Sequence, residues 1–105
     1  MTFLEWPTPT RTASSQLVKT VAASGTPEAI SATSLRVRRA IIIGRSDEQT
    51  DNADIVRIGT SSVNGEQPLD IAPGAYGPTL ENVDLSQWYV DAASNGDGVV
   101  VVYER

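Results

Sequence analysis

Hydrophobic and polar residues alternate in short runs along this chain, as they do in β-strands that bury one face. The longest run, LRVRRAIII, starts at Leu35 and alternates strictly through Val37. Arg36 and Arg38 lie on its outward side, but Arg39 falls on the inward side, where an unpaired charge is costly. We therefore expect a β-bulge near Arg38 and Arg39 that resets the alternation.

Two stretches are apolar on both faces, AIII at 40–43 and VVVV at 99–102. Strands of this kind need cover on both sides, so we expect them at the centres of the sheets. The valine run belongs to a C-terminal block that we expect to be a strand over 80–92, a tight hairpin turn at 95–98 and a second strand over 99–103. The rest of the chain, or another subunit, must cover these strands.

Shorter strand and turn signals fill the remainder of the chain. Asn64 and Gly65 form a turn dipeptide, and the glycines and prolines around Tyr76 predict a loop there. The expected strands number about seven or eight, and no stretch has convincing helical spacing. The pattern predicts an all-β fold, a single β-sandwich or jelly roll of short antiparallel strands over residues 16–105. The further strands expected are 16–22, 28–31, 55–59 and 68–71.

Residues 1–15, MTFLEWPTPTRTASS, differ from the rest and are predicted to form an extended N-terminal arm. The two prolines disfavour helix and favour extended backbone. Phe3, Leu4 and Trp6 place three large apolar side chains at the tip, which a disordered tail would not need. Either these side chains fold back onto the domain, or the arm docks on a neighbouring subunit through aromatic anchors.

Composition narrows the class of protein. The chain has 105 residues, enough for one small domain, and it contains no cysteine and no histidine. Disulfides and cysteine-based zinc sites are therefore excluded, and the usual general base near neutral pH is absent. The formal net charge of −5 makes the chain a poor ligand for nucleic acid. Because we find neither a membrane-spanning apolar run nor a signal peptide, we expect no membrane contact and synthesis in the cytosol.

Candidate chemical sites are few. The acidic loop at 47–54 lacks the regular ligand spacing of a calcium site, so a solvated loop is the preferred interpretation. The sequence NGDG at 95–98 fits a hairpin turn better than a metal site. No carboxylate pair stands out, and the serines and threonines have no obvious activating base. We therefore expect no catalysis, no cofactor, no metal and no small-molecule substrate. The carboxylates of the acidic loop are Asp47, Glu48, Asp51 and Asp54.

Arginines and aromatic residues supply the candidate contact residues. Arg36, Arg38 and Arg39 form a basic cluster that could pair with carboxylates of a partner subunit. The alternative is a solvated strand face whose charges prevent edge-to-edge pairing. Trp88 and Tyr89 are adjacent in a strand and so point to opposite faces, and we expect Trp88 in the core.

An ordered series of motifs runs through most of the chain, over about residues 16–105. In this order the motifs resemble small virion proteins of tailed bacteriophages, of the head decoration (cement) or head-fibre type. Such proteins are usually β-sandwiches without catalytic residues. The motifs are VKTV at 18–21, the arginine- and isoleucine-rich strand, IVRIG at 55–59, IAPG at 71–74, VDLS at 83–86, YVDA at 89–92 and GDGV at 96–99.

The resemblance implies a structural virion protein that decorates and stabilises a capsid by bridging neighbouring capsid subunits. The implied partners are the major capsid protein and further copies of this chain, commonly a homotrimer, and the implied location is the capsid surface after synthesis in the host cytoplasm. The alternatives are a tail or head-fibre adaptor and a carbohydrate-binding module that uses Tyr76, Trp88 or Tyr89. The candidate partner-binding residues, chosen on physical grounds alone, are Phe3, Leu4, Trp6, Arg36, Arg38 and Arg39.

Overall fold

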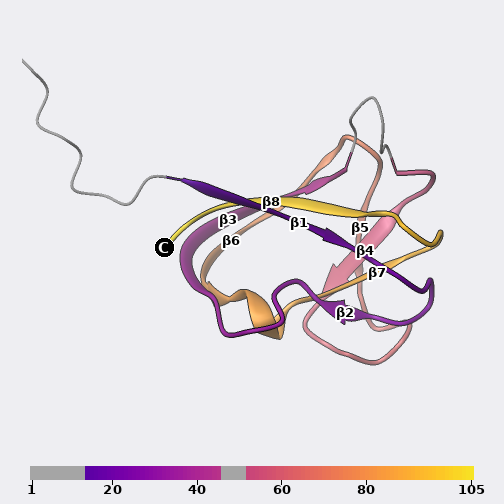
Figure 1. The fold of residues 1–105 in the computed structure, drawn as a ribbon, viewed down its shortest axis with the longest axis horizontal. Helices are drawn as coiled ribbons and strands as arrows, with labels where there is room; N and C mark the ends of the chain where they lie inside the picture. Colours follow the sequence, from indigo (N-terminus) through magenta and orange to yellow (C-terminus); the bar gives the residue numbers. More distant parts are fainter. Residues whose placement is uncertain (1–13, 46–51) are drawn as a thin grey trace, which may run out of the picture.

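The computed structural model describes residues 14–45 and 52–105. These residues form eight strands and one short 3-10 helix (Figure 1). The elements are β1 (Ser15–Thr20), β2 (Glu28–Ala29), β3 (Arg36–Gly44), β4 (Val56–Gly59), β5 (Leu69–Ile71), β6 (Tyr76–Asp84), η1 (Leu85–Gln87), β7 (Tyr89–Ala92) and β8 (Gly98–Glu104).

The strands form two four-stranded antiparallel sheets, sheet I in the order β1-β8-β3-β6 and sheet II in the order β2-β7-β4-β5. Strand β1 pairs with β8, β2 with β7, β3 with β6 and β4 with β5. This nested pairing is the one obtained when a long hairpin of strands is rolled over on itself, and it is the topology of a jelly roll. The predicted all-β sandwich or jelly roll is confirmed. Of the predicted arm over residues 1–15, residues 1–13 lie outside the described residues, and Ser15 already belongs to β1.

The core lies between the two sheets. Inward residues alternate with outward residues along each strand, so that Val99 and Val101 of β8 are fully buried while Val100 and Val102 are partly exposed. Burying a side chain of this size stabilises the fold by about 1.5–3 kcal/mol. The largest fully buried side chains are Ile42, Ile58, Ile71, Leu85, Val21, Val56, Val90, Val99 and Val101.

The two doubly apolar runs occupy the centre of sheet I, as expected. They are direct neighbours, because β3 and β8 pair with Ile42 opposite Val101 and Ile41 opposite Val102. Their inward residues enter the core, whereas their outward residues lie on the face of sheet I that sheet II does not cover.

The change of phase in β3 is confirmed, but the bulge predicted near Arg38 and Arg39 is not present there. Val37 and Ala40 are both buried, while Arg38 and Arg39 between them are exposed. The pairing with β6 keeps its register across this point, so no residue is inserted. Asn82, on the opposing strand at this point, adopts a φ of 56°, a backbone conformation that asparagine tolerates better than most residues. The register shift between β3 and β6 lies further on, between Ile41 and Ile43.

The C-terminal block is divided between the two sheets, so the predicted continuous strand over 80–92 and the hairpin after it are wrong. Strand β6 ends at Asp84, η1 follows, and β7 continues in sheet II before the chain returns to sheet I as β8. Asp84 caps η1, because its side chain accepts a hydrogen bond from the Ser86 amide. The predicted loop at Tyr76 is also wrong, because this residue begins β6.

The glycines of the turn at 95–98 serve two different purposes. Gly96 has a φ of 88°, which matches the expectation that glycine supplies positive φ in this turn. Gly98 instead lies against β1, where an added Cβ would be 2.0 Å from the carbonyl oxygen of Lys19. The buried side chain of Asn52 fixes this position, because it donates to the Gly98 carbonyl and accepts from the Gly98 amide, both at 2.8 Å.

Candidate interaction surfaces

Part of the outer face of sheet I is apolar. One row crosses all four strands, with Val18 opposite Val100, Val100 opposite Ile43, and Ile43 opposite Tyr76. Val18 is 55% exposed and Tyr76 75% exposed. We call the following six residues the outer patch: Val18, Ile41, Ile43, Tyr76, Val100 and Val102.

A second row extends the outer patch along the strands. Ile41 and Val102 face each other at its centre, and Gln16 and Thr79 flank them on the edge strands. The apolar residues therefore form a contiguous block with polar residues beside it. Contiguous apolar surface rimmed by polar residues is typical of protein interaction sites.

The outer face of sheet II is polar by contrast. Arg57 and Asp70 form an ion pair there, with 3.1 Å between Nε and Oδ1. Asp91, also on this face, accepts a 2.9 Å hydrogen bond from the Gly25 amide, so a loop covers part of it. The outer face of sheet II thus carries charged and hydrogen-bonded side chains, whereas the outer patch of sheet I exposes apolar side chains.

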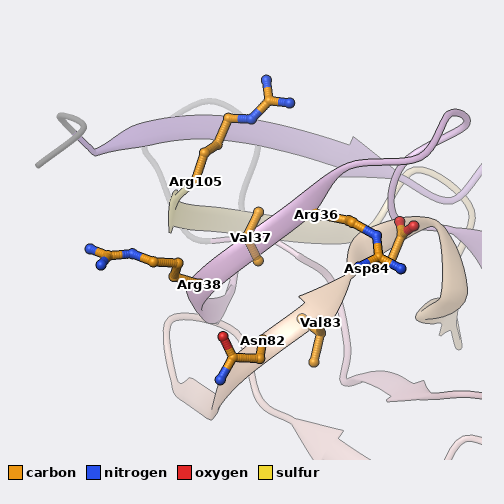
Figure 2. A pocket seen from close by; sticks show the side chains of 7 residues that line it. All are labelled: Arg36, Val37, Arg38, Asn82, Val83, Asp84 and Arg105. Atoms are coloured by element: carbon orange, nitrogen blue, oxygen red, sulfur yellow. The ribbon is translucent and has the colours of Figure 1, made fainter.

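A second candidate surface is a shallow hollow at the end of sheet I, between β3, β6 and the C-terminus (Figure 2). Three arginines and one aspartate surround an apolar base formed by Val37 and Val83. Figure 2 shows the side chains of Arg38 and Arg105 pointing in different directions from the strands that carry them. The basic hollow, of about 380 Å³, is lined by Arg36, Val37, Arg38, Asn82, Val83, Asp84 and Arg105.

The charges of the basic hollow are only partly compensated. Arg38 lies 3.4 Å from a carboxylate oxygen of Glu104. Arg36 and Arg105 have no ion pair within the described ranges 14–45 and 52–105. Because the guanidinium groups do not converge on one point, the hollow suits several carboxylates on an extended partner segment better than one small anion.

The carboxylate of Asp84 is occupied by hydrogen bonds within its own chain, so it is not free to pair with these arginines. It accepts hydrogen bonds from the Ser34 hydroxyl at 2.6 Å, the Leu35 amide at 2.9 Å and the Ser86 amide at 3.0 Å. The Ser34 hydroxyl contributes most, and together these donors hold the pKa of Asp84 well below its usual range. The carboxylate therefore joins the start of β3 to η1 and remains ionised.

Replacing Asp84 with asparagine should lower the melting temperature at pH 7, because it weakens the acceptor for these donors. The folded-state pKa lies below that of the unfolded chain, so the stabilisation is complete above about pH 5 and decreases as the pH falls through about 4 and below. The difference in melting temperature between wild type and Asp84→Asn should therefore shrink on acidification. Asp70→Asn, at an exposed ion pair, is the control and should change little. A difference that stays constant from pH 7 to about 3 would contradict this account of the carboxylate.

The structure separates the predicted contact residues. Arg36 and Arg38 line the basic hollow, but Arg39 lies on the outer face of sheet I, opposite Glu81 and Glu104. The predicted tip residues Phe3, Leu4 and Trp6 lie outside the described residues. Sequence reasoning missed Arg105, which only the pairing of β8 beside β3 brings to the hollow. The outer patch was not predicted either, although the two runs that are apolar on both faces, at 40–43 and 99–102, indicated it.

The aromatic residues lie in different environments. Trp88 packs partly buried against the core, which agrees with the expectation for it. Tyr89 is half-buried, and Tyr76 is the most exposed large hydrophobic residue in the described part of the chain. A flat platform built from several exposed aromatics is therefore not present among the described residues.

The acidic loop can be assessed only in part, because Asp47, Glu48 and Asp51 lie outside the described residues. Asp97 accepts hydrogen bonds from the amides of Ala53 and Asp54, both at 2.9 Å, so its carboxylate is occupied in holding the end of this loop. Within 14–45 and 52–105 no group of three or more acidic side chains is arranged to hold a metal ion. Nor do these residues include a helix long and apolar enough to cross a membrane.

Comparison with protein-family models, with curated proteins and with solved structures finds no match. The two surfaces and the order of motifs in the sequence are therefore the features that bear on function.

Proposed function

We propose that this protein is a structural virion protein that decorates and stabilises a bacteriophage capsid by bridging neighbouring capsid subunits. The outer patch carries the proposal. Its six apolar residues lie on one face of a four-stranded sheet, where Val18 and Tyr76 are exposed and the other four are partly exposed, and this favours burial against another protein. The resemblance of the motifs to phage decoration and head-fibre proteins supplies the virion as the setting.

Bridging requires at least two contact surfaces, and the chain offers two of different chemistry. The outer patch suits apolar side chains of a further copy of this chain, and the basic hollow suits carboxylates of a capsid subunit. A protein that binds the assembled shell and not its free subunits stabilises the shell by mass action. We propose the major capsid protein and further copies of this chain, as a homotrimer, as the partners, and the capsid surface as the location.

The proposed role needs binding surfaces and no reaction, and we propose no enzymatic activity. The jelly roll supplies rigidity, because both sheets are joined through one core. The fold alone does not decide function, since jelly rolls also occur in lectins.

Imaging of the virion tests the proposal. Purified particles of a phage that encodes this chain should contain it in stoichiometric amounts by mass spectrometry. A cryo-electron microscopy reconstruction should show its jelly roll on the outside of the shell, in contact with more than one capsid subunit. Density confined to the tail or to the base of a head fibre would replace this proposal with the adaptor role, and absence from the virion would reject both.

Carbohydrate binding is the second candidate, favoured by one observation, the 75% exposure of Tyr76. An aromatic ring at the surface can stack on a sugar, and Trp88, packed against the core, is not placed to do so. Titration with host cell-surface glycans should show saturable binding that Tyr76→Ala abolishes if this role is correct. Equal binding by wild type and Tyr76→Ala, or no binding, would reject it.

A further inference from the structure

We infer that the outer patch of one copy binds the apolar tip, residues 3–6, of the N-terminal segment of a second copy. This inference rests on one part of the proposed function, the contact between copies of this chain, and deepens it; the contact would hold with or without a capsid. It assigns one occupant to a surface that the described chain leaves open.

The chemistry of the two partners matches. The outer patch consists of β-branched side chains in register across β1, β8 and β3, with Tyr76 at the far edge. Aromatic and β-branched side chains pair favourably on a pleated surface. The tip sequence FLEW provides two aromatic rings and a leucine in four residues.

The position of the segment also matches. Residues 1–13 lead directly into β1, which is an edge strand of sheet I and carries Val18 of the outer patch. The eight Cα-to-Cα steps from Trp6 to Ser14 span at most about 26–29 Å when extended. Sheet I is four strands across, or about 14 Å between its edge strands, so the segment is long enough to reach a neighbouring copy and lie across its outer patch.

Local sequence favours a second copy over the same copy. To reach its own outer patch, the tip would have to reverse direction between Trp6 and Ser14 and run back along β1 to Val18, about 13 Å beyond Ser14. The residues available for this reversal, WPTPTRTAS, include no glycine, asparagine or aspartate, the usual turn residues apart from proline and serine. Pro7 and Pro9 favour extended backbone instead, which disfavours such a reversal.

The contact joins two different surfaces, the tip of one copy and the outer patch of the next. Contacts of this heterologous kind build closed rings when the rotation between copies closes. A ring of three is the closed form that agrees with the homotrimer proposed above.

Association of the purified protein tests the inference. The experiment uses full-length protein with Trp88→Phe, so that Trp6 is the only tryptophan. Sedimentation should show a trimer that dissociates on dilution, with Trp6 emission at shorter wavelength in the trimer than in the monomer. Val18→Lys should weaken association by at least roughly tenfold and shift Trp6 emission to longer wavelength.

Val63→Lys is the matched control, because Val63 is 54% exposed, close to the 55% of Val18, but lies in the loop between β4 and β5. It should associate like the parent. A tip variant, Phe3→Ala with Leu4→Ala, removes the other side of the contact and should dissociate as Val18→Lys does, so a folding defect on one side cannot imitate the result.

Three outcomes would overturn the inference. Equal association of Val18→Lys and Val63→Lys would show that the outer patch is not the binding surface. A monomer at every concentration whose Trp6 emission is at short wavelength would place the tip on its own domain. A monomer with Trp6 emission at long wavelength would show that the tip is not bound at all. Each outcome leaves the location of the protein in the virion to be decided separately by imaging.

Discussion

A protein that lacks residues 1–13 should keep its fold and lose capsid decoration. The fold should persist because β1 begins at Ser15, which pairs with Tyr103, and the residues of the hydrophobic core cluster lie between Leu17 and Tyr103. Decoration should fall by at least roughly a hundredfold in affinity, because without the three large apolar residues of the tip the copies no longer associate and the gain from multivalent binding is lost. Thermal melts compare the folds, and co-sedimentation with undecorated capsids measures binding.

The matched control keeps the length of the segment and replaces Phe3, Leu4 and Trp6 with serine. This variant should bind as poorly as the truncated protein if the anchors matter, and as well as wild type if only the length matters. Decoration by the truncated protein at wild-type affinity would show that the segment has no role in binding the shell. The truncation should stop at residue 13, because removing Ser15 would also shorten β1.

Replacing Gly98 with alanine should destabilise the domain by about 3 kcal/mol. The added Cβ would meet the Lys19 carbonyl oxygen at 2.0 Å and the Thr20 Cα at 2.8 Å. Both atoms belong to the backbone of β1, so relief requires β1 and β8 to move apart. That movement disturbs the ladder from Thr20 opposite Gly98 to Ser15 opposite Tyr103. Urea denaturation measures the free energy of unfolding.

Gly96→Ala is the matched control two residues away. Gly96 has a positive φ but open space around it, so an added Cβ meets no atom within 4 Å. The cost should be about 1 kcal/mol, from backbone strain alone. Equal costs at the two positions would mean that β1 yields easily and that the close approach at Gly98 does not limit stability.

In the two candidate surfaces, side-chain direction can be predicted from one strand alone, but proximity between strands cannot. The alternation in β3 predicted correctly that Arg36 and Arg38 point outward, because side-chain direction follows from local backbone geometry. The same reasoning could not place Arg105 beside them, because that proximity depends on the register of β8 against β3. The pairing of Arg38 with Glu104, 66 residues apart in the sequence, has the same origin.

The predicted strand boundaries near the C-terminus were wrong for a related reason. The run from Leu80 to Ala92 contains few strong breakers, so its local propensity is compatible with one strand. The break at η1 depends on Asp84, whose carboxylate receives the Ser86 amide within the turn and the Ser34 hydroxyl from the start of β3. One of these donors is 50 residues distant, and only the packed fold supplies it.

The sequence by itself determined the all-β class, the number of strands to within one, and the two doubly apolar runs that form the centre of a sheet. These follow from the period of two in side-chain direction and from turn residues, which act locally. The tertiary structure decided the jelly-roll pairing, the division of the C-terminal block between two sheets and the exposure of the outer patch. Each of these depends on contacts between distant strands, so the same valine run that supplies the core also supplies, through its alternate residues, the surface that we propose for binding.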